Sequence, residues 1–357
     1  MERARSQVLR SAKGAGAVGS LAALAALAAF AGDAARPSPA FGQSKVGTTF
    51  GQFLKIEPSS RFAGMGNAGT AFFDGLDAAY YNPAAVVGKG EKEAQFTHSE
   101  WFAGIGYNYA AAAVPIQKLG TFYASATVLS SGDIAVRTVT QPLGTGELYH
   151  VTNVAVGLGY GHAFGDRLAV GLSANYVQET IWNSSAHAWT LNLGTLYRVS
   201  ANGLSIGASL LNFGTDAQYD GDDLRITYDQ DPDAGGDNST LPADKFTGSY
   251  NVPVLFRVGL SYPYQLNQNT RVNVAVDAFH ANDNFESVSP GAEMLFKDRF
   301  AVRAGWQNLF LDDGEMGATL GAGLNGRFQE VRYRFDYAWA DYGRIGDAHR
   351  LTLGVEF

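Results

Sequence analysis

The sequence predicts an all-β fold, a transmembrane antiparallel β-barrel of about fourteen strands with a short N-terminal hatch segment. Three observations carry this prediction. The 357 residues are 46% hydrophobic but only 17% charged, which is little charge for a soluble protein. After Glu93 most segments alternate apolar with polar or small residues, the period of strands. Short and long connections also alternate along the chain. We therefore expect a leader at 1–42, a hatch at 43–92 and the barrel at 93–357.

The first 42 residues carry the features of a secretory signal peptide. Four basic residues precede the apolar run AVGSLAALAALAAF. That run falls short of the roughly twenty residues that cross a bilayer, which disfavours the alternative of a permanent anchor. Small residues precede two possible cleavage points, one after Ala31 and one before Gln43, and we expect the second. The sequence therefore predicts export.

The segments near the C-terminus show the alternation most clearly. In EVRYRFDYAWAD the apolar residues from Val331 to Trp339 share one face, whereas Arg332, Arg334 and Asp336 share the other. A soluble sandwich turns its charged face to water, but a membrane barrel turns its apolar face to lipid and its charges to the lumen. The alternation alone is compatible with both folds.

Connection lengths favour the barrel. Tight joins such as IQKL, GDR and KDR alternate with longer ones, including 130–150 and 214–251, which a compact soluble domain rarely tolerates. With a periplasmic N-terminus every long join falls outside the cell. The predicted strands span 94–101, 104–115, 119–129, 151–164, 167–180, 186–199, 203–213, 252–263, 270–281, 285–296, 299–310, 316–328, 330–341 and 347–357.

Side-chain type on these strands predicts a filled lumen and an aromatic girdle. Aromatic residues recur near strand ends, for example Tyr160, Tyr176 and Tyr342, as they do at membrane interfaces. Charged residues on the other face indicate a polar interior, because an apolar conduit disfavours charge. The charges predicted to face the lumen are Arg257, Arg303, Arg332, Arg334, Asp336 and Arg350.

Composition disfavours several function classes. The net charge is -8 and no basic stripe is present, which argues against a nucleic-acid partner. The chain has no cysteine, its six histidines lack ligand spacing, and no nucleophile and base stand out as a pair. We therefore expect neither an enzyme nor a bound cofactor.

The glycine-rich stretch GMGNAG, Gly64 to Gly69, has the spacing of a dinucleotide-binding turn but lacks its context. The fingerprint needs an apolar strand before it, whereas KIEPSSR precedes these glycines and Asn82-Pro83 follows them. Small residues instead allow a short helix or turn to approach the barrel wall closely. We expect packing, and not a nucleotide, to explain the glycines.

The surrounding stretch, RFAGMGNAGTAFFDGLDAAYYNPAAV, resembles the N-terminal signature of the PorV/PorQ family of outer-membrane proteins. Family members often have two adjacent aspartates where this chain separates Asp74 from Asp77. The resemblance implies a fourteen-stranded barrel like the long-chain fatty-acid transporters, with the hatch inside. The matching hatch positions are Arg61, Gly64, Met65, Gly66, Asp74, Asp77, Tyr81, Asn82 and Pro83. The terminal Phe357 likewise resembles the signal read by the barrel assembly machinery.

The resemblance implies two functions. In the first, extracellular loops bind secreted cargo or secretion components and so aid type IX protein secretion. In the second, the barrel is an outer-membrane channel for long-chain fatty acids or other hydrophobic solutes. The sequence favours the first, because the 214–251 connection is acidic and suits a wet recognition surface. Outer-membrane lipid is the remaining expected partner.

The acidic connection also contains a weak metal candidate. Asp229, Asp231, Asp233 and Asp237 reproduce part of a calcium-loop spacing. However, Ala234 and Thr240 stand where that loop needs glycine and a bidentate glutamate. We expect a solvated acidic loop without metal.

Overall fold

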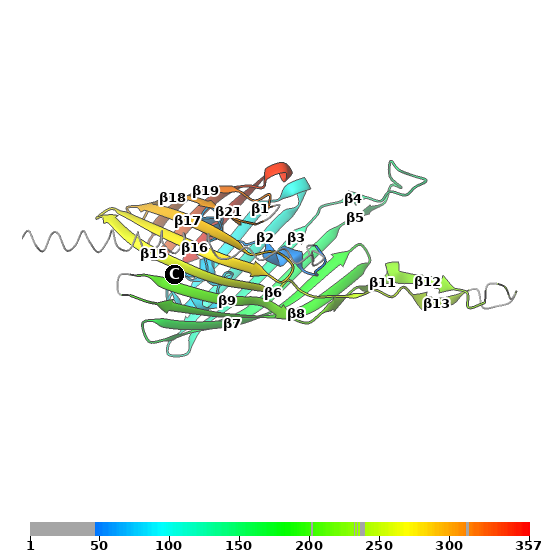
Figure 1. Cartoon of the computed structure of the whole chain (residues 1–357), viewed down its shortest axis with the longest axis horizontal. Helices are drawn as coiled ribbons and strands as arrows, with labels where there is room; N and C mark the ends of the chain where they lie inside the picture. Colours follow the sequence, from blue (N-terminus) through cyan, green and yellow to red (C-terminus); the bar gives the residue numbers. More distant parts are fainter. Residues whose placement is uncertain (1–46, 201–202, 232, 234, 236–239, 312–313) are drawn as a thin grey trace, which may run out of the picture. The chain divides into compact units, whose positions relative to one another are not determined.

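The barrel is a closed antiparallel sheet of fourteen strands, as predicted. The computed structural model describes residues 47–200, 203–231, 233, 235, 240–311 and 314–357, so the predicted leader lies outside the described residues. The strands run in chain order around the barrel, and β1 pairs with β21 from Glu93 opposite Glu356 to Glu100 opposite His349. Pairing of β8 with β9 completes the ring, which leaves no long sheet edge exposed (Figure 1).

The wall strands are β1 (Glu93–Glu100), β2 (Gly106–Ile116), β3 (Gly120–Ser130), β6 (Val151–Phe164), β7 (Leu168–Ile181), β8 (Ser184–Arg198), β9 (Ser205–Gly214), β15 (Leu255–Asn267), β16 (Thr270–Ala281), β17 (Ser287–Phe296), β18 (Phe300–Trp306), β19 (Ala318–Phe328), β20 (Val331–Asp341) and β21 (Asp347–Glu356). All fourteen predicted segments correspond to these strands. β18 is shorter than predicted and ends at Trp306, because Asn308 and Phe310 take positive φ and turn the chain.

Short elements occupy the connections and the lumen. The connections hold β4 (Ile134–Ala135), β5 (Leu148–Tyr149), β10 (Ala217–Gln218), β11 (Asp220–Gly221), β12 (Arg225–Tyr228), β13 (Leu241–Asp244), β14 (Ser249–Tyr250), and the 3-10 turns η3 (Phe102–Gly104), η4 (Asp222–Leu224) and η5 (Gly343–Ile345). The hatch holds η1 (Gln52–Lys55), α2 (Ser60–Ala63), α3 (Leu76–Ala79) and η2 (Pro83–Val87). Among the described residues, no helix is both long and apolar enough to cross a membrane.

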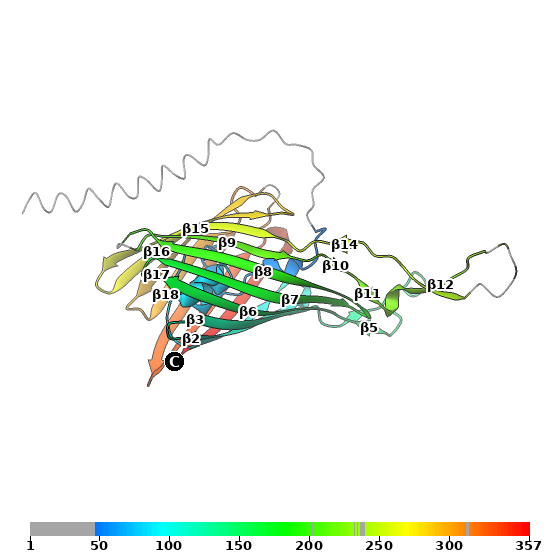
Figure 2. The same cartoon turned by 90° about the horizontal axis from the view of Figure 1, so that it is seen from below.

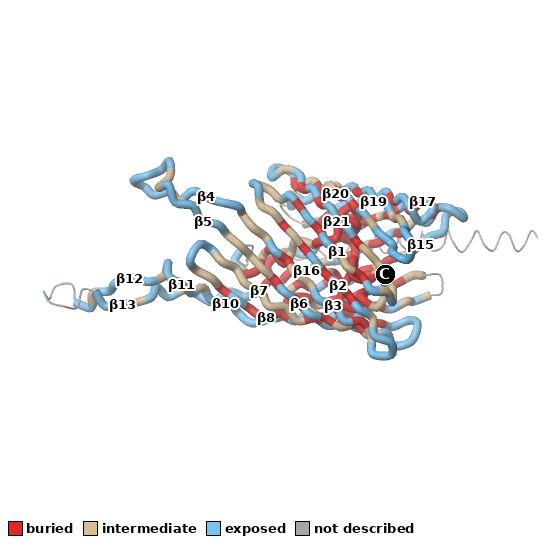
Figure 3. Tube along the Cα trace, turned by 180° about the vertical axis from the view of Figure 1, so that it is seen from behind, coloured by how far each residue is buried: buried red, intermediate tan, exposed pale blue. Residues whose placement is uncertain are grey.

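Burial is inverted relative to a soluble protein. On β21 the apolar Leu351 and Leu353 are 42% and 50% exposed, whereas Arg350 and Thr352, which alternate with them, are buried. The same alternation runs along most wall strands (Figure 3). Because the apolar face points away from the lumen, lipid and not water is its natural solvent. Tyr342 departs from the predicted girdle: it is buried and packs against Trp101 and Phe102 inside the barrel's end.

The two ends of the barrel differ in their connections. Tight turns join β2 to β3, β6 to β7 and β17 to β18 at one end, whereas the β4–β5 and β12–β13 hairpins extend from the other (Figures 1 and 2). One join at the long-loop end is unexpectedly short: only Trp182 and Asn183 link β7 to β8. Asn183 supports the long connection, because its backbone N–H and side-chain amide donate to Asp223.

The outward apolar face generates a first prediction. Leu158, near the middle of β6, is 69% exposed. Leu158→Arg should destabilise the folded barrel by about 2–4 kcal/mol, because it places a charge in hydrocarbon. Val139→Arg, in a connection and fully exposed, is the matched control and should leave stability unchanged. Urea unfolding of both variants in lipid vesicles measures the difference, and equal stabilities would contradict a lipid-facing β6.

Candidate functional site in the barrel lumen

The hatch lies inside the barrel and divides into two parts. Its outer part, residues 47–57, is here called the strap, and residues 58–88 are called the hatch core. The core packs α2 against β19, β20 and β21, α3 against β1 and β2, and η2 against β6, β7 and β8. Phe62, Met65 and Tyr81 form a fully buried cluster at its centre. The chain leaves the lumen beside Lys89 and enters β1.

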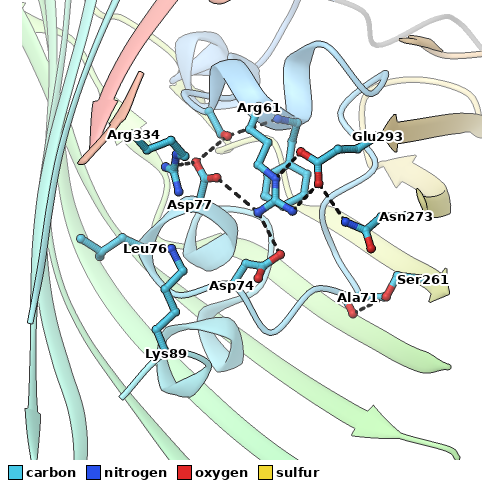
Figure 4. A network of polar contacts seen from close by, with 12 residues as sticks. Arg61, Ala71, Asp74, Leu76, Asp77, Lys89, Ser261, Asn273, Glu293 and Arg334 are labelled. Atoms are coloured by element: carbon cyan, nitrogen blue, oxygen red, sulfur yellow. Dashed lines mark hydrogen bonds and ion pairs between the residues drawn. The ribbon is translucent and has the colours of Figure 1, made fainter. Parts of the chain in front are cut away.

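Arg61 joins the hatch core to the wall by charge (Figure 4). Its Nε and Nη2 donate to the two carboxylate oxygens of Glu293 on β17, at 2.9 and 2.8 Å. Its Nη1 lies 2.9 Å from Asp74 and 3.8 Å from Asp77. The two aspartates, separated in sequence, therefore converge on one guanidinium. The bidentate geometry with Glu293 is the strongest form of this contact.

Further ion pairs extend the Arg61 contact across the wall. Arg303 lies 2.6 Å from Glu293 and 2.7 Å from Asp336. Arg334 lies 2.6 Å from Asp336 and 3.0 Å from Asp77. Burial opposes ionisation of Asp77, but Arg334 and Arg61 outweigh it and hold its pKa below the ordinary 3.8. We call this buried set, Arg61, Asp77, Glu293, Arg303, Arg334 and Asp336, the charge lock.

The glycines of the motif are contact points with the wall. A Cβ on Gly64 would lie 2.8 Å from the backbone of Gly321, and one on Gly66 would lie 2.5 Å from the carbonyl oxygen of Trp306. Gly66 also has a φ of +66°, which side chains rarely adopt. Met65 between them is fully buried. The geometry is that of close packing, and the described residues here show no phosphate-binding turn.

The end of the motif fixes η2. The Asn82 side chain accepts the N–H of Ala84 at 3.1 Å and donates to the carbonyl oxygens of Thr70 and Thr195, both at 2.9 Å. Pro83 occupies the first position of η2, where a missing N–H costs nothing. The Tyr81 hydroxyl donates to Asn67 at 2.9 Å. These contacts hold η2 against β6, β7 and β8.

The strap crosses the long-loop end of the lumen and is held by a latch that sequence patterns did not reveal. Asp283, in the connection after β16, is buried and accepts hydrogen bonds from Thr49, Gln52 and Lys55 at 2.9, 2.7 and 2.6 Å. Burial raises the pKa of Asp283, but the bonds from Lys55 and Gln52 outweigh it and hold the pKa below the ordinary 3.8.

Wall and core side chains tie the strap at further points. Arg257 lies 2.5 Å from Glu57, and the Gly51 N–H donates to Glu179 at 3.0 Å. The hydroxyls of Tyr80 and Tyr107 donate to the strap carbonyls of Leu54 and Ile56, at 2.8 and 2.9 Å.

Two cavities adjoin the hatch core. Between the strap and the core lies a small internal cavity of about 40 Å³, here called the inner cavity, roofed by Leu54. At the tight-turn end a vestibule of about 850 Å³ is lined by nine basic and four acidic side chains. The strap, the hatch core and its buried charges therefore lie between the outside and this vestibule.

The remaining predicted residues lie apart from one another. Arg350 is buried beneath Trp101, whereas the Arg332 side chain is 48% exposed at the vestibule and pairs with Glu91 and Glu356. Asp229, Asp231 and Asp233 lie between β12 and β13, and Asp237 lies outside the described residues. Within the described part of the chain, no group of three or more histidines or acids is arranged to hold a metal. Phe357 exchanges backbone hydrogen bonds with Lys92.

The charge lock generates a second prediction. Arg61→Met should destabilise the folded barrel by about 3–5 kcal/mol and raise ion conductance in planar bilayers, because it removes the cation that the buried carboxylates Glu293 and Asp77 share. Arg225→Met is the matched control. It removes an exposed pair with Asp222, so neither stability nor conductance should change measurably. Wild-type conductance in Arg61→Met would show that the core is held by packing alone.

Comparison with known proteins identifies the fold. No protein-family model and no curated protein matches the chain. Its structure is similar to the toluene transporter TodX of Pseudomonas putida (14% identity, 84% of this chain and 98% of that chain, TM-score 0.51). It is also similar to a FadL homologue of Pseudomonas aeruginosa (12%, 84% and 98%, 0.51) and to the toluene transporter TbuX of Ralstonia pickettii (14%, 84% and 97%, 0.50). The chain has the barrel fold of these transporters, and with its apolar outer face it is a protein of the bacterial outer membrane.

Proposed function

We propose that this protein is a gated outer-membrane channel through which hydrophobic solutes pass, and that the arrangement described above is its closed state. The observation that carries the proposal is the strap. It is a segment separate from the wall, it covers an internal cavity, and polar contacts to a single loop aspartate hold its outer part in place. The shared fold with toluene transporters supports the proposal, which involves no catalysis.

Solute entry requires the strap to move. Phe50, Phe53 and Leu54 are buried against Val177 and Val252, so displacement of the strap would uncover an apolar surface for a hydrophobic solute. Neutral hydrogen bonds of the kind that Tyr80 and Tyr107 form contribute about 0.5–1.5 kcal/mol each. A solute that binds better beneath a displaced strap therefore shifts the population towards the open state.

We also propose kinship with the PorV/PorQ family, on the hatch motif, and a secretion role as the second candidate function. The observation that favours this role is the β12–β13 hairpin, whose Tyr228 is exposed together with Phe246 nearby, at 52% and 90%. Exposed aromatic side chains on a projecting loop are typical of recognition surfaces. The channel remains the first candidate because the transporter fold supports it.

The latch generates a third prediction. Asp283→Asn should raise uptake of radiolabelled toluene severalfold in bacterial cells that carry the protein, because the charge that holds Lys55 is lost. Lys55→Met should act in the same direction. Asp298→Asn, at an exposed turn of the opposite end, is the matched control and should leave uptake unchanged. Unchanged uptake in both latch variants would contradict the gate.

The pKa of Asp283 generates a fourth prediction. Because its pKa in the folded protein lies below the ordinary 3.8, the latch contributes its full stabilisation above that value and loses it as the pH falls through the lower one. Toluene uptake should therefore stay constant from neutral pH to pH 5 and rise only in stronger acid. A rise that is complete above pH 5 would identify another group as the latch.

Deletion of 225–244 separates the two candidate functions. The Lys245 N–H donates to the Leu224 carbonyl at 2.9 Å, so a short glycine link can rejoin the ends without disturbing β10 or the rim. For a channel, toluene uptake should remain within about twofold of wild type, because lipid-facing strands determine folding. Normal uptake together with lost export of secreted proteins would instead favour the secretion role.

A further inference from the structure

The lumen is divided by charge. The charge lock lies on one side, with its wall members on β17, β18 and β20, and Arg257, Asp277 and Arg350 are buried on the neighbouring strands β15, β16 and β21. The inner cavity lies on the other side, among β2, β3, β6, β7, β8 and β9, and no charged side chain lines it. Nine of its thirteen lining residues nevertheless carry a hydroxyl or an amide, and only Leu54, Ala79, Ala155 and Leu211 are apolar.

From this lining we infer that the inner cavity binds uncharged solutes that join an aromatic body to a hydrogen-bonding oxygen, with phenol as the simplest representative. The inference rests on the proposed channel function and names its solute class. It distinguishes such solutes both from pure hydrocarbons and from carboxylates.

The lining disfavours the other two classes for separate reasons. A carboxylate would be buried without a counter-ion among the lining residues, which is costly. A hydrocarbon would separate pairs such as Asn192 and Ser173, now 2.9 Å apart, without replacing their hydrogen bonds. A site built from hydrogen-bonding groups rejects a ligand that leaves them unpaired. A solute with its own hydroxyl compensates for what it displaces.

Aromatic side chains supply the surface for the body of the solute. Tyr80 and Tyr109 meet edge to face with ring centroids 6.0 Å apart, and Tyr123 adds a third ring to the lining. Edge-to-face and offset contacts of this kind favour a further aromatic ring. The cavity therefore offers aromatic faces and hydrogen-bonding groups together.

Tyr80 connects binding to opening. In the closed state its hydroxyl donates to the Leu54 carbonyl of the strap at 2.8 Å. The closed cavity of about 40 Å³ is far smaller than the roughly 150 Å³ of an engineered cavity that holds benzene. A solute of this class therefore fits only when Leu54 moves away, and that movement frees the Tyr80 hydroxyl to donate to the oxygen of the solute.

Two tyrosines provide a matched test. Tyr80 and Tyr107 both donate to strap carbonyls, but only Tyr80 lines the inner cavity. Titration calorimetry of the purified full chain in detergent micelles would use phenol, toluene and benzoate as probes. We expect wild type to bind phenol at least tenfold more tightly than the other two. Tyr80→Phe should weaken phenol binding about tenfold without weakening toluene binding, whereas Tyr107→Phe should not weaken phenol binding.

Specific outcomes overturn the inference. Toluene or benzoate binding as tight as phenol binding in wild type would do so, and so would equal loss of phenol binding in the two tyrosine variants. If Tyr80→Phe fails to fold, as judged by heat-modifiable migration, Ser125→Ala on the cavity wall is the second variant, and unchanged phenol affinity in it would count against the site.

The phenol-binding site and the channel function can be contradicted independently of each other. If Asp283→Asn raises toluene uptake by cells while the purified protein shows no preference for phenol, the channel stands and the solute class is wrong. If phenol binding depends on Tyr80 but neither latch variant changes the uptake of toluene or phenol, the site stands and the channel is wrong.

Discussion

The bidentate contact between Arg61 and Glu293 is the interaction on which the rest of the lumen depends. Glu293 is fully buried on β17, and a carboxylate in that position requires a paired cation. Arg61 provides one from the hatch while Arg303 provides another from the wall, so the Glu293 carboxylate joins the hatch core to the wall between two cations. The position of α2 follows from this pair, and it fixes where the strap ends and where η2 meets the opposite wall.

The division of the lumen into a charged side and a neutral side gives the two parts of the hatch different mobilities. Moving the core separates buried ion pairs, and an unpaired buried charge costs about 3–5 kcal/mol. The strap is held in part by neutral bonds, such as that between Tyr107 and Ile56, which cost far less to break, and by two ion pairs, Lys55 with Asp283 and Glu57 with Arg257. The strap also depends on Asp283, which belongs to a connection and not to the wall. The proposed channel thus combines a fixed core with a strap that moves.

Local signals predicted the strands, because alternation reports directly which side chains face lipid. They did not predict the partners of the hatch: Arg61 and Glu293 are 232 residues apart, and no local pattern relates them. The convergence of Asp74 and Asp77 was accessible in principle, since residues three apart share a face when a helical turn begins between them. The aromatic-girdle prediction failed at Tyr342, which is buried where the chain turns inward. No sequence pattern predicted the contact between Lys55 and Asp283, because a single contact between two connecting segments leaves no periodic pattern in the sequence.

In the proposed channel, confining motion to the strap also preserves the barrier of the outer membrane. A channel that opened by expelling its whole hatch would expose the vestibule and its nine basic side chains to the outside, and ions would pass with the solute. With the charge lock closed, displacement of the strap uncovers the inner cavity, which no charged side chain lines, and the charged groups that lose strap partners are Arg257 and Asp283. Admission of an uncharged solute is then separated from ion leakage, because the bonds that select the solute and the bonds that seal the lumen lie on opposite walls.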